Sequence, residues 1–218
     1  MTNNLPILAI ETSGDLCSVA VMLNDKYYVE SNIKGKHIHS EKIFDMIDYV
    51  VKSSKIELSD FNQIAVSIGP GSFTGLRIGL SAAKGLALGS NLPIVPVPTF
   101  EVMALEISEK MAEGKKFAIL KSASINDFYY AVYETEKNGY KKIEDVSLIH
   151  KNELNKKITE FDIIFADKDI SPEIKIISGP HAIYVALWSY LYGKELLTYN
   201  YDYLEPFYLK QFIAKVKK

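Results

Sequence analysis

The sequence has little of what several common protein functions require. Only one of its 218 residues is cysteine, Cys17, so no disulfide can form within the chain. Neither sign of charge predominates, because 25 basic residues are balanced by 27 acidic ones and the net charge is −2. A protein that binds nucleic acid through its own surface usually has a basic face or a high isoelectric point. The composition therefore argues against direct RNA binding by this chain alone.

A membrane span and the residue groupings of several enzyme classes are also missing. No stretch reaches the roughly 20 apolar residues that cross a bilayer, and the first residues lack a basic region followed by a long apolar run. We therefore expect a cytoplasmic protein with no membrane contact. The four histidines form no H-x-x-x-H pair, and no G-x-S-x-G elbow of a serine hydrolase occurs. These absences favour a binding subunit over an enzyme, and they predict no metal and no cofactor.

Glycines are never paired, and several of them gather in one stretch, residues 64–89. Ile64, Val66 and Ile68 are typical of a buried strand, and the glycines and proline at 69–71 predict a turn. Ser72 or Thr74 can cap the helix that follows, which is apolar nearly all round and so has to be covered on more than one side. With a further strand predicted over 92–98, this stretch indicates a βαβ unit in a mixed sheet.

A ridge of small residues runs along this predicted helix. Gly71, Gly75 and Gly79 recur every four residues, and Ala82 and Ala83 extend them. Glycine inside a helix costs up to about 1 kcal/mol relative to alanine, so we expect another part of the structure to approach this ridge closely. Packing within one domain and a subunit interface both satisfy that expectation. A Walker phosphate loop does not fit, since no Lys followed by Ser or Thr comes directly after the last glycine.

The remaining elements indicate two similar halves. A three-strand meander is predicted at 7–10, 17–23 and 26–30, followed by a helix with Ser40 as its N-cap. The second half has strands at 117–120, 128–134, 140–149, 161–165 and 174–177, with a helix over 99–111 that Thr99 caps, a small helix over 151–158, and a last helix from 178 to 192. We expect two lobes, residues 1–98 and 99–218, and the tail from about 195 can pack back on the first lobe.

A polar turn separates the first two strands. Glu11, Thr12, Ser13 and Gly14 place an acid, two hydroxyls and a glycine between strands. Phosphate-gripping turns of sugar-kinase-like and actin-like ATPases have this composition, and so do ordinary hairpin turns. Such ATPases usually have a second phosphate-gripping turn with paired glycines, which this sequence lacks.

Two stretches closely resemble the bacterial TsaB family, also called YeaZ: ILAIETSGDLCSVAV at residues 7–21 and GPGSFTGLRIGLSAAKGLA at residues 69–87. His39-Ser40-Glu41 and residues 206–210 also look like family landmarks. The resemblance implies a two-lobed α/β fold of the actin-like (ASKHA, ribonuclease H-like) kind with mixed sheets. It also implies a part in making threonylcarbamoyladenosine beside the anticodon of tRNA.

The same resemblance implies partners and a surface for them. A TsaB-like chain is expected to be a non-catalytic scaffold that forms a heterodimer with TsaD and activates it, with TsaE as a further partner and tRNA reached only through the complex. When alone, the chain can form a homodimer. TsaD carries two metal-binding histidines where Thr99 and Met103 stand here, so the metal and the chemistry are expected in the partner. The predicted interface lies on two helices: His39, Ile43, Ile47, Val50, Phe73, Gly75, Arg77, Gly79, Ala82, Ala83 and Leu86.

The sequence departs from the usual TsaB pattern at the expected cleft between the lobes. Glu11 replaces an aspartate, Ser122-Ala123-Ser124 replaces Asp-Ala-Arg, and His181 replaces a glycine. These changes predict weak or no nucleotide binding at Glu11, Thr12 and Ser13. The alternatives to a scaffold are a metal-free actin-like nucleotide-binding protein and a glycoprotease-like peptidase.

Overall fold

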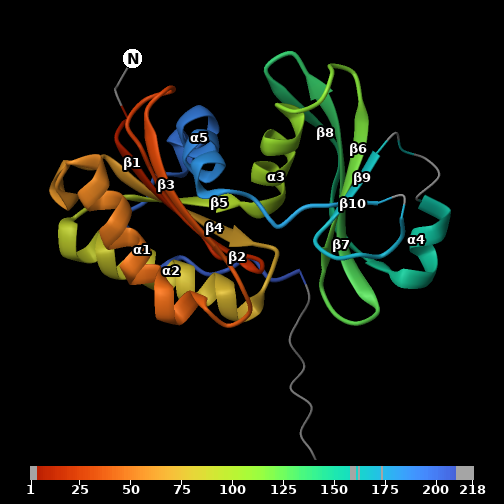
Figure 1. Cartoon of the computed structure of the whole chain (residues 1–218), viewed down its shortest axis with the longest axis horizontal. Helices are drawn as coiled ribbons and strands as arrows, with labels where there is room; N and C mark the ends of the chain where they lie inside the picture. Colours follow the sequence, from red (N-terminus) through yellow and green to blue (C-terminus); the bar gives the residue numbers. More distant parts are fainter. Residues whose placement is uncertain (1–3, 158–160, 162, 173, 210–218) are drawn as a thin grey trace, which may run out of the picture.

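The fold is known from a computed structural model, which describes residues 4–157, 161, 163–172 and 174–209. Two five-stranded sheets stand side by side, with helices around and between them (Figure 1). The strands are β1 (Ile7–Glu11), β2 (Leu16–Met22), β3 (Tyr28–Lys34), β4 (Gln63–Gly69), β5 (Ile94–Pro98), β6 (Lys116–Ser122), β7 (Asp127–Glu136), β8 (Gly139–His150), β9 (Ile163–Ala166) and β10 (Lys175–Ile176). The helices are α1 (His39–Ser54), α2 (Phe73–Ser90), α3 (Thr99–Ser108), α4 (Lys151–Lys157) and α5 (Ala182–Tyr192). None of the helices in these ranges is long and apolar enough to cross a membrane.

The two sheets have the same topology. Their orders are β3-β2-β1-β4-β5 and β8-β7-β6-β9-β10. In each sheet the first three strands along the chain are antiparallel neighbours and the last two are added in parallel. The predictions of mixed sheets and of a meander in each half are confirmed. Residue 162 of the predicted strand 161–165 and residue 158 of the predicted small helix lie outside the described residues.

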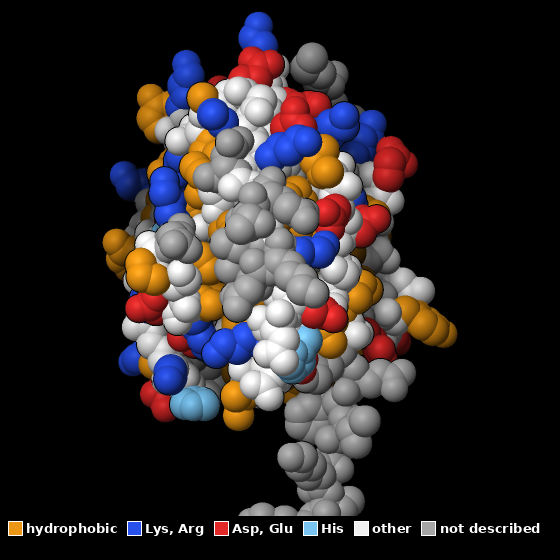
Figure 2. Space-filling view, turned by 90° about the vertical axis from the view of Figure 1, so that its right-hand side faces the viewer, with side chains coloured by type: hydrophobic (Ala, Val, Ile, Leu, Met, Phe, Trp, Pro, Cys, Tyr) orange, Lys and Arg blue, Asp and Glu red, His pale blue; other side chains and the backbone are white. Residues whose placement is uncertain are grey.

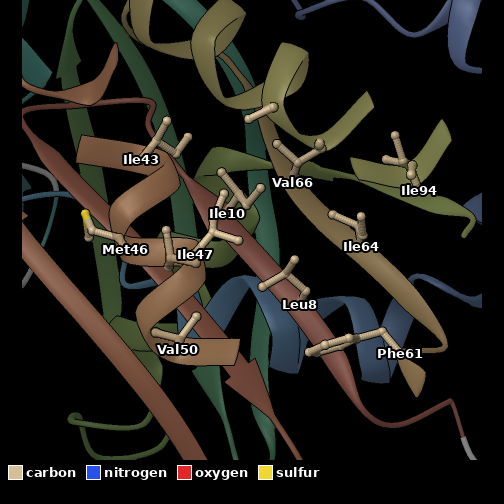
Figure 3. Close-up of a cluster of buried hydrophobic side chains, with 14 of the residues drawn as sticks. Leu8, Ile10, Ile43, Met46, Ile47, Val50, Phe61, Ile64, Val66 and Ile94 are labelled. Atoms are coloured by element: carbon tan, nitrogen blue, oxygen red, sulfur yellow. The ribbon is translucent and has the colours of Figure 1, made fainter. Parts of the chain in front are cut away.

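The first sheet is covered on one face by α1 and α2. Ile43, Met46, Ile47 and Val50 recur at helical spacing on α1 and point toward Leu8, Ile10, Ile64 and Val66 on β1 and β4 (Figure 3). Because side chains alternate along a strand, the remaining residues of β1 face the other side of the sheet. All of these side chains are buried, so the sheet needs a cover on its second face as well.

Helix α5 supplies that second cover. Ile7 and Ala9 of β1 pack with Val185, Ala186 and Trp188 of α5. The chain returns to the first lobe earlier than the predicted tail from about residue 195, because the return begins with α5 at Ala182. A bridge between Ile94 and Thr198 then ties the following segment to β5, at the edge of the first sheet.

Helix α3 lies between the sheets and contributes to both cores. Val102 and Leu105 pack against the first sheet and α5, whereas Phe100, Met103 and Ile107 pack against the second sheet. We propose that the lobe boundary after residue 98 separates the two sheets, with α3 shared between them and α5 belonging to the first lobe.

Three predicted helix caps have different outcomes. Ser72 caps α2, since its Oγ accepts a hydrogen bond from Gly75 N at 3.2 Å. The cap predicted at Ser40 is wrong, because the N-cap residue of α1 is Ile38, two residues earlier, and Ser40 lies inside the helix. The cap predicted at Thr99 is also wrong: Pro98 is the N-cap residue, and Thr99 Oγ1 instead accepts a hydrogen bond from Gly69 N at 3.1 Å, which ties the start of α3 to the end of β4.

Candidate functional site

A groove of about 470 Å³ runs between α1 and α2. Both helices pack on the same face of the first sheet (Figure 1). Its lining residues are Ser40, Ile43, Phe44, Phe73, Thr74, Arg77, Ile78, Ser81 and Ala82. Large apolar side chains stay exposed on the same two helices, with Phe44 59% exposed and Leu88 73% exposed. Apolar surface that the fold leaves uncovered beside a groove is typical of a protein-binding site.

Arg77 is held in place at the groove by two aromatic side chains. Its guanidinium carbon lies 3.9 Å from the centre of the Phe73 ring, a cation–π contact. Its Nε donates a hydrogen bond to the hydroxyl oxygen of Tyr208 at 3.0 Å, and the Phe73 and Tyr208 ring centres are 5.0 Å apart. The segment after α5 therefore returns to α2 and fixes a cation beside an apolar groove.

The eleven residues predicted for the interface fall into two groups. Phe73, Arg77 and Leu86 reach the surface at least in part. The other eight are buried: His39, Ile43, Ile47, Val50, Gly75, Gly79, Ala82 and Ala83. Of these eight, Ile43 and Ala82 still line the groove. The prediction followed the apolar stripe of each helix, and that stripe faces the sheet.

Sequence reasoning missed five residues that line the groove. These are Ser40 and Phe44 on α1 and Thr74, Ile78 and Ser81 on α2. Helical spacing could have identified the three missed residues on α2. Positions 74, 78 and 81 recur at intervals of four and three, so they share the side of the helix away from its buried stripe.

The glycine ridge packs against its own chain. A Cβ added at Gly75 would overlap the carbonyl oxygen of Thr12, and one added at Gly79 would overlap Thr12 Oγ1. A Cβ at Gly71 would overlap the carbonyl oxygen of Ser13, whereas one at Gly85 would meet nothing within 4 Å. Of the two explanations, internal packing is correct for the ridge. Gly75 and Gly79 therefore cannot contact a partner as predicted, because the β1–β2 turn already covers them.

The polar turn Glu11-Thr12-Ser13 is buried and supports the fold. Thr12 Oγ1 donates to the Gly75 carbonyl oxygen at 2.8 Å, Ser13 N donates to Glu11 Oε1 at 2.5 Å, and Ser72 N donates to the Ser13 carbonyl oxygen at 2.8 Å. These bonds join β1 to the start of α2. Weak or absent nucleotide binding at this turn stays a prediction.

A cavity of about 160 Å³ lies where this turn meets the second lobe. It is lined by Ser13, Gly14, Asp15, Lys34, Ser72, Lys121, Ser122, Asp167, Lys168 and Ser178. Pockets that hold drug-sized ligands are commonly about 300–1,000 Å³, so this cavity suits a smaller group. Ser122, one of the departures from the usual pattern, donates to Asp167 Oδ1 through its Oγ at 3.0 Å. Ser124 donates to Asp127 Oδ2 at 2.7 Å, so both serines form bonds within the second lobe.

His181 joins the start of α5 to α3. Its backbone N donates to Glu106 Oε2 at 3.0 Å, and its ring Nδ1 lies 2.9 Å from Glu106 Oε1. Lys110 Nζ also contacts Glu106 Oε1 at 2.9 Å. These groups line a pocket of about 300 Å³ formed by α3 and the segment around Gly179. The histidine that replaces the usual glycine therefore ties the returning helix α5 to α3.

Both members of the pair have shifted pKa values. Burial opposes ionisation of Glu106, but the hydrogen bonds from His181 and Lys110 outweigh it and lower the pKa of this carboxyl. The hydrogen bond to Glu106 raises the pKa of His181 against the opposing effect of partial burial. The folded protein therefore favours the charged form of each side chain.

Replacing His181 with glutamine should give a loss of stability that depends on pH. A raised histidine pKa contributes stability below the ordinary value of 6.5, and that contribution disappears as pH rises through the folded-state pKa. A lowered carboxyl pKa contributes above 4.5 and is lost as pH falls through its folded-state value. The loss, measured by urea unfolding, should be largest between about pH 5 and 6 and smaller at pH 8.5. In a Glu106→Gln background this pH dependence should largely vanish. A loss that is the same at pH 5.5 and 8.5 would contradict the role of the pair.

Comparison with known proteins identifies the family. A family model described as "TsaD: tRNA N6-adenosine threonylcarbamoyltransferase" matches residues 33–167, which is more than half of the chain. The tRNA threonylcarbamoyladenosine biosynthesis protein TsaB of Escherichia coli K12 is 34% identical over 148 residues, covering 68% of this chain and 63% of that protein. The chain belongs to this family, as one of its TsaB members.

Further relatives agree with this TsaB assignment. The TsaB protein of Haemophilus influenzae is 33% identical over 135 residues, covering 62% of this chain and 56% of its own length. The chain thus spans less than two thirds of the curated TsaB proteins that it matches. Among solved structures, YeaZ from Pseudomonas aeruginosa superposes with a TM-score of 0.75 at 18% identity, covering 94% of this chain and 99% of that one. The two-lobed α/β fold with mixed sheets expected from the resemblance is confirmed, and YeaZ shares it.

The TsaB chain has no imidazole at the two positions where the resemblance places the metal-binding histidines of TsaD. Thr99 is buried and bonded to Gly69 N, and Met103 packs into the core of the second lobe. Across the described ranges, no group of three or more His, Cys, Asp or Glu side chains is arranged to hold a metal ion.

On the face shown in Figure 2, Lys and Arg side chains lie among Asp and Glu side chains.

Proposed function

We propose that this chain is a non-catalytic subunit in the formation of threonylcarbamoyladenosine on tRNA. It pairs through α1 and α2 with a TsaD-type transferase and activates it, with TsaE as a further partner and tRNA bound only by the complex. The observation that carries the proposal is the groove between α1 and α2, which the described residues leave open. The names of the TsaB relatives support the pathway.

The chemistry of the groove suits a protein partner. Aromatic and arginine side chains at the centre of an interface commonly provide most of its binding energy. Phe44 and Phe73 offer apolar rings, and Arg77 is already ordered by Phe73 and Tyr208, so binding costs it little side-chain entropy. A guanidinium has five N–H donors, and Tyr208 accepts from one of them, which leaves donors for a carboxylate of the partner. The partner face is therefore apolar with an acidic group near Arg77.

Assigning the transferase chemistry to the partner is supported by Thr99 and Met103. A hydroxyl is a poor ligand for iron or zinc, and a thioether is a soft one. Three residues at the cleft that differ from the usual TsaB pattern form hydrogen bonds within this chain: Glu11, Ser122 and His181. The proposal therefore requires the purified chain alone to show negligible ATP turnover and negligible peptide hydrolysis. The nucleotide-binding and peptidase alternatives do not require these results.

Replacing Phe44 with glutamate should weaken pairing with the TsaD of the same organism by about tenfold or more, which corresponds to about 1.4 kcal/mol. A charge would then sit in the apolar groove, while the stability of the monomer should change little because Phe44 is mostly exposed. Pairing is measured by titration calorimetry, and tRNA modification is measured with purified TsaD, TsaE and tRNA.

The matched control is Tyr27→Glu, an exposed aromatic residue in the β2–β3 turn outside the groove. That variant should pair and support modification as the unchanged chain does. Size-exclusion chromatography of the chain alone tests whether a second copy occupies the same groove, in which case Phe44→Glu should also dissociate the homodimer. Equal pairing by both variants would refute the α1–α2 surface, and wild-type modification without this chain would refute the subunit role.

A further inference from the structure

The pocket of about 300 Å³ beside α3 has mostly apolar walls. One wall is formed by Met103 and Ile107 of α3 and by Met111, which follows the helix. The opposite wall comes from the edge of the second sheet, where Phe165 of β9 and Ile177, directly after β10, belong to the same apolar cluster. Because β10 is the outermost strand of this sheet, no strand of the described residues lies beyond it. The walls suit a ligand with an apolar body.

Cationic side chains line the same pocket. They are Lys110, Lys175 and His181, and Glu106 is the single carboxylate among the described lining residues. Both oxygens of Glu106 are already used, Oε1 by Lys110 Nζ and His181 Nδ1, and Oε2 by His181 N. Lys175 forms no ion pair with a described residue, and its Nζ lies 6.0 Å from the centre of the Phe165 ring. An ammonium has three N–H donors, so both lysines have donors left for an anionic ligand.

This pocket differs from the cavity of about 160 Å³ at the β1–β2 turn. The two have Ser178 in common, but Ser13, Gly14 and Ser72 of the first lobe line the smaller cavity and not this pocket. The pocket is formed by α3 and by residues 175–181, through which the chain passes from the second sheet to α5. A ligand here would therefore contact the link between the lobes.

Two methionines and a phenylalanine in the walls favour an aromatic ring. A thioether sulfur makes favourable contacts with aromatic rings, and the unbranched methionine side chain adapts its shape to them. Pockets for small organic ligands commonly measure about 300–1,000 Å³, and this one lies at the lower end of that range. It has space for a single ring with a short arm.

We propose that this pocket binds a small aromatic carboxylate. The ring lies between Met103, Met111 and Phe165, and the carboxylate accepts hydrogen bonds from Lys110 and Lys175. Bound there, the ligand holds α3 against the link to α5, next to the contact between His181 and Glu106. The site is separate from the α1–α2 groove, so its test does not depend on pairing with TsaD.

The five methionines of the chain allow a test that also locates the ligand. Their methyl groups are labelled with carbon-13 and followed by NMR while 3-phenylpropionate is added. The Met103 and Met111 signals should shift because of the ring, with a dissociation constant on the order of 1 mM, usual for a ligand of about eleven non-hydrogen atoms. Met22 and Met46 lie in the cores on either face of the first sheet and should not shift, which makes them internal controls.

Two further probes separate the ring from the charge. The neutral 3-phenylpropanamide keeps the ring and should bind at least about threefold more weakly, because it loses the attraction of the partly exposed ammonium groups. Propionate keeps the carboxylate without the ring and should leave the Met103 and Met111 signals unchanged. The proposal is overturned if 3-phenylpropionate at about ten times the expected dissociation constant does not move these two signals. It is also overturned if the acid and the amide bind equally well.

Replacing Lys175 with glutamine tests the assigned contact to the carboxylate. Lys175 is exposed, so the fold should be unaffected. The variant should bind 3-phenylpropionate about three- to fivefold more weakly than the wild type and 3-phenylpropanamide equally well. The matched control is Lys141→Gln, an exposed lysine on β8 outside the pocket, which should bind both probes as the wild type does. An equal loss in both variants would overturn the proposal, since it would assign the effect to the overall charge of the protein.

Discussion

Replacing Gly75 with alanine should destabilise the protein by about 3 kcal/mol, the upper part of the usual range for overpacking. The added methyl group would overlap the carbonyl oxygen of Thr12, which is backbone and cannot rotate away. Accommodating it requires α2 to move off the β1–β2 turn, and this movement would break the bond from Thr12 Oγ1 to the Gly75 carbonyl oxygen. The melting temperature should fall by about 6–12 °C, and urea unfolding should show the same loss of free energy.

The same substitution at Gly85 is the matched control. Gly85 lies on the same helix, but a Cβ there meets nothing within 4 Å. Alanine should therefore raise the free energy of unfolding by about 0.5–1 kcal/mol, because it has the higher helix propensity. Opposite signs at two positions of one helix follow only if the ridge packs internally. Equal effects at Gly75 and Gly85 would show that α2 is not held against this turn.

Replacing Trp188 with alanine should cost about 3–5 kcal/mol, the range usual for removing a large buried aromatic side chain. Trp188 belongs to the core formed by α5, the first sheet and α3. Its Nε1 donates to the hydroxyl oxygen of Tyr140 at 2.8 Å, and that hydroxyl donates to Glu101 Oε2 at 2.5 Å. Burial and the neighbouring Glu101 carboxylate raise the pKa of Tyr140, so the phenol stays protonated and able to donate. Unfolding is followed by urea titration of circular dichroism.

Trp188→Phe separates the two contributions of this residue. Phenylalanine retains most of the apolar area and removes the N–H donor, so the loss should be only about 1 kcal/mol, the typical net value of one hydrogen bond. If the alanine and phenylalanine variants lose the same free energy of unfolding, Trp188 stabilises the protein through its hydrogen bond to Tyr140 and not through the packing of α5.

The sequence was sufficient for most of the helices and strands, for the mixed sheets and for the meander in each half. Val66 and its β-branched neighbours marked β4, and the apolar stripe from Ile43 to Val50 marked α1, because hydrophobic periodicity reports local structure directly. β3 was harder to delimit. It extends to Lys34 through a polar stretch, since its ladder to β2 pairs Leu16 with Lys34, and such pairing depends on backbone hydrogen bonds more than on side-chain type.

The candidate site was less predictable for a physical reason. Small and apolar residues on a helix show that something packs against it, but they do not say what. For Gly75 and Gly79 the neighbour is Thr12, more than sixty positions away in the chain, and only the fold brings them together. Thr99 has the residue type of an N-cap, yet its hydroxyl is used by Gly69 N from another element. The burial of Lys121 on β6 gave no signal either, because one lysine in a strand is usually exposed.

The return of α5 to the first sheet affects how the chain folds on the ribosome. After β5 has been made, the first sheet has all five strands, but the face carrying Ile7 and Ala9 still lacks α5. The roughly ninety residues from β5 to the end of α5 take about 5–20 s to synthesise at ordinary rates of translation. Throughout that interval the nascent sheet exposes an apolar face that the finished protein buries, and such a face is a binding site for chaperones and a starting point for aggregation. The first lobe therefore completes its folding only when most of the second lobe already exists.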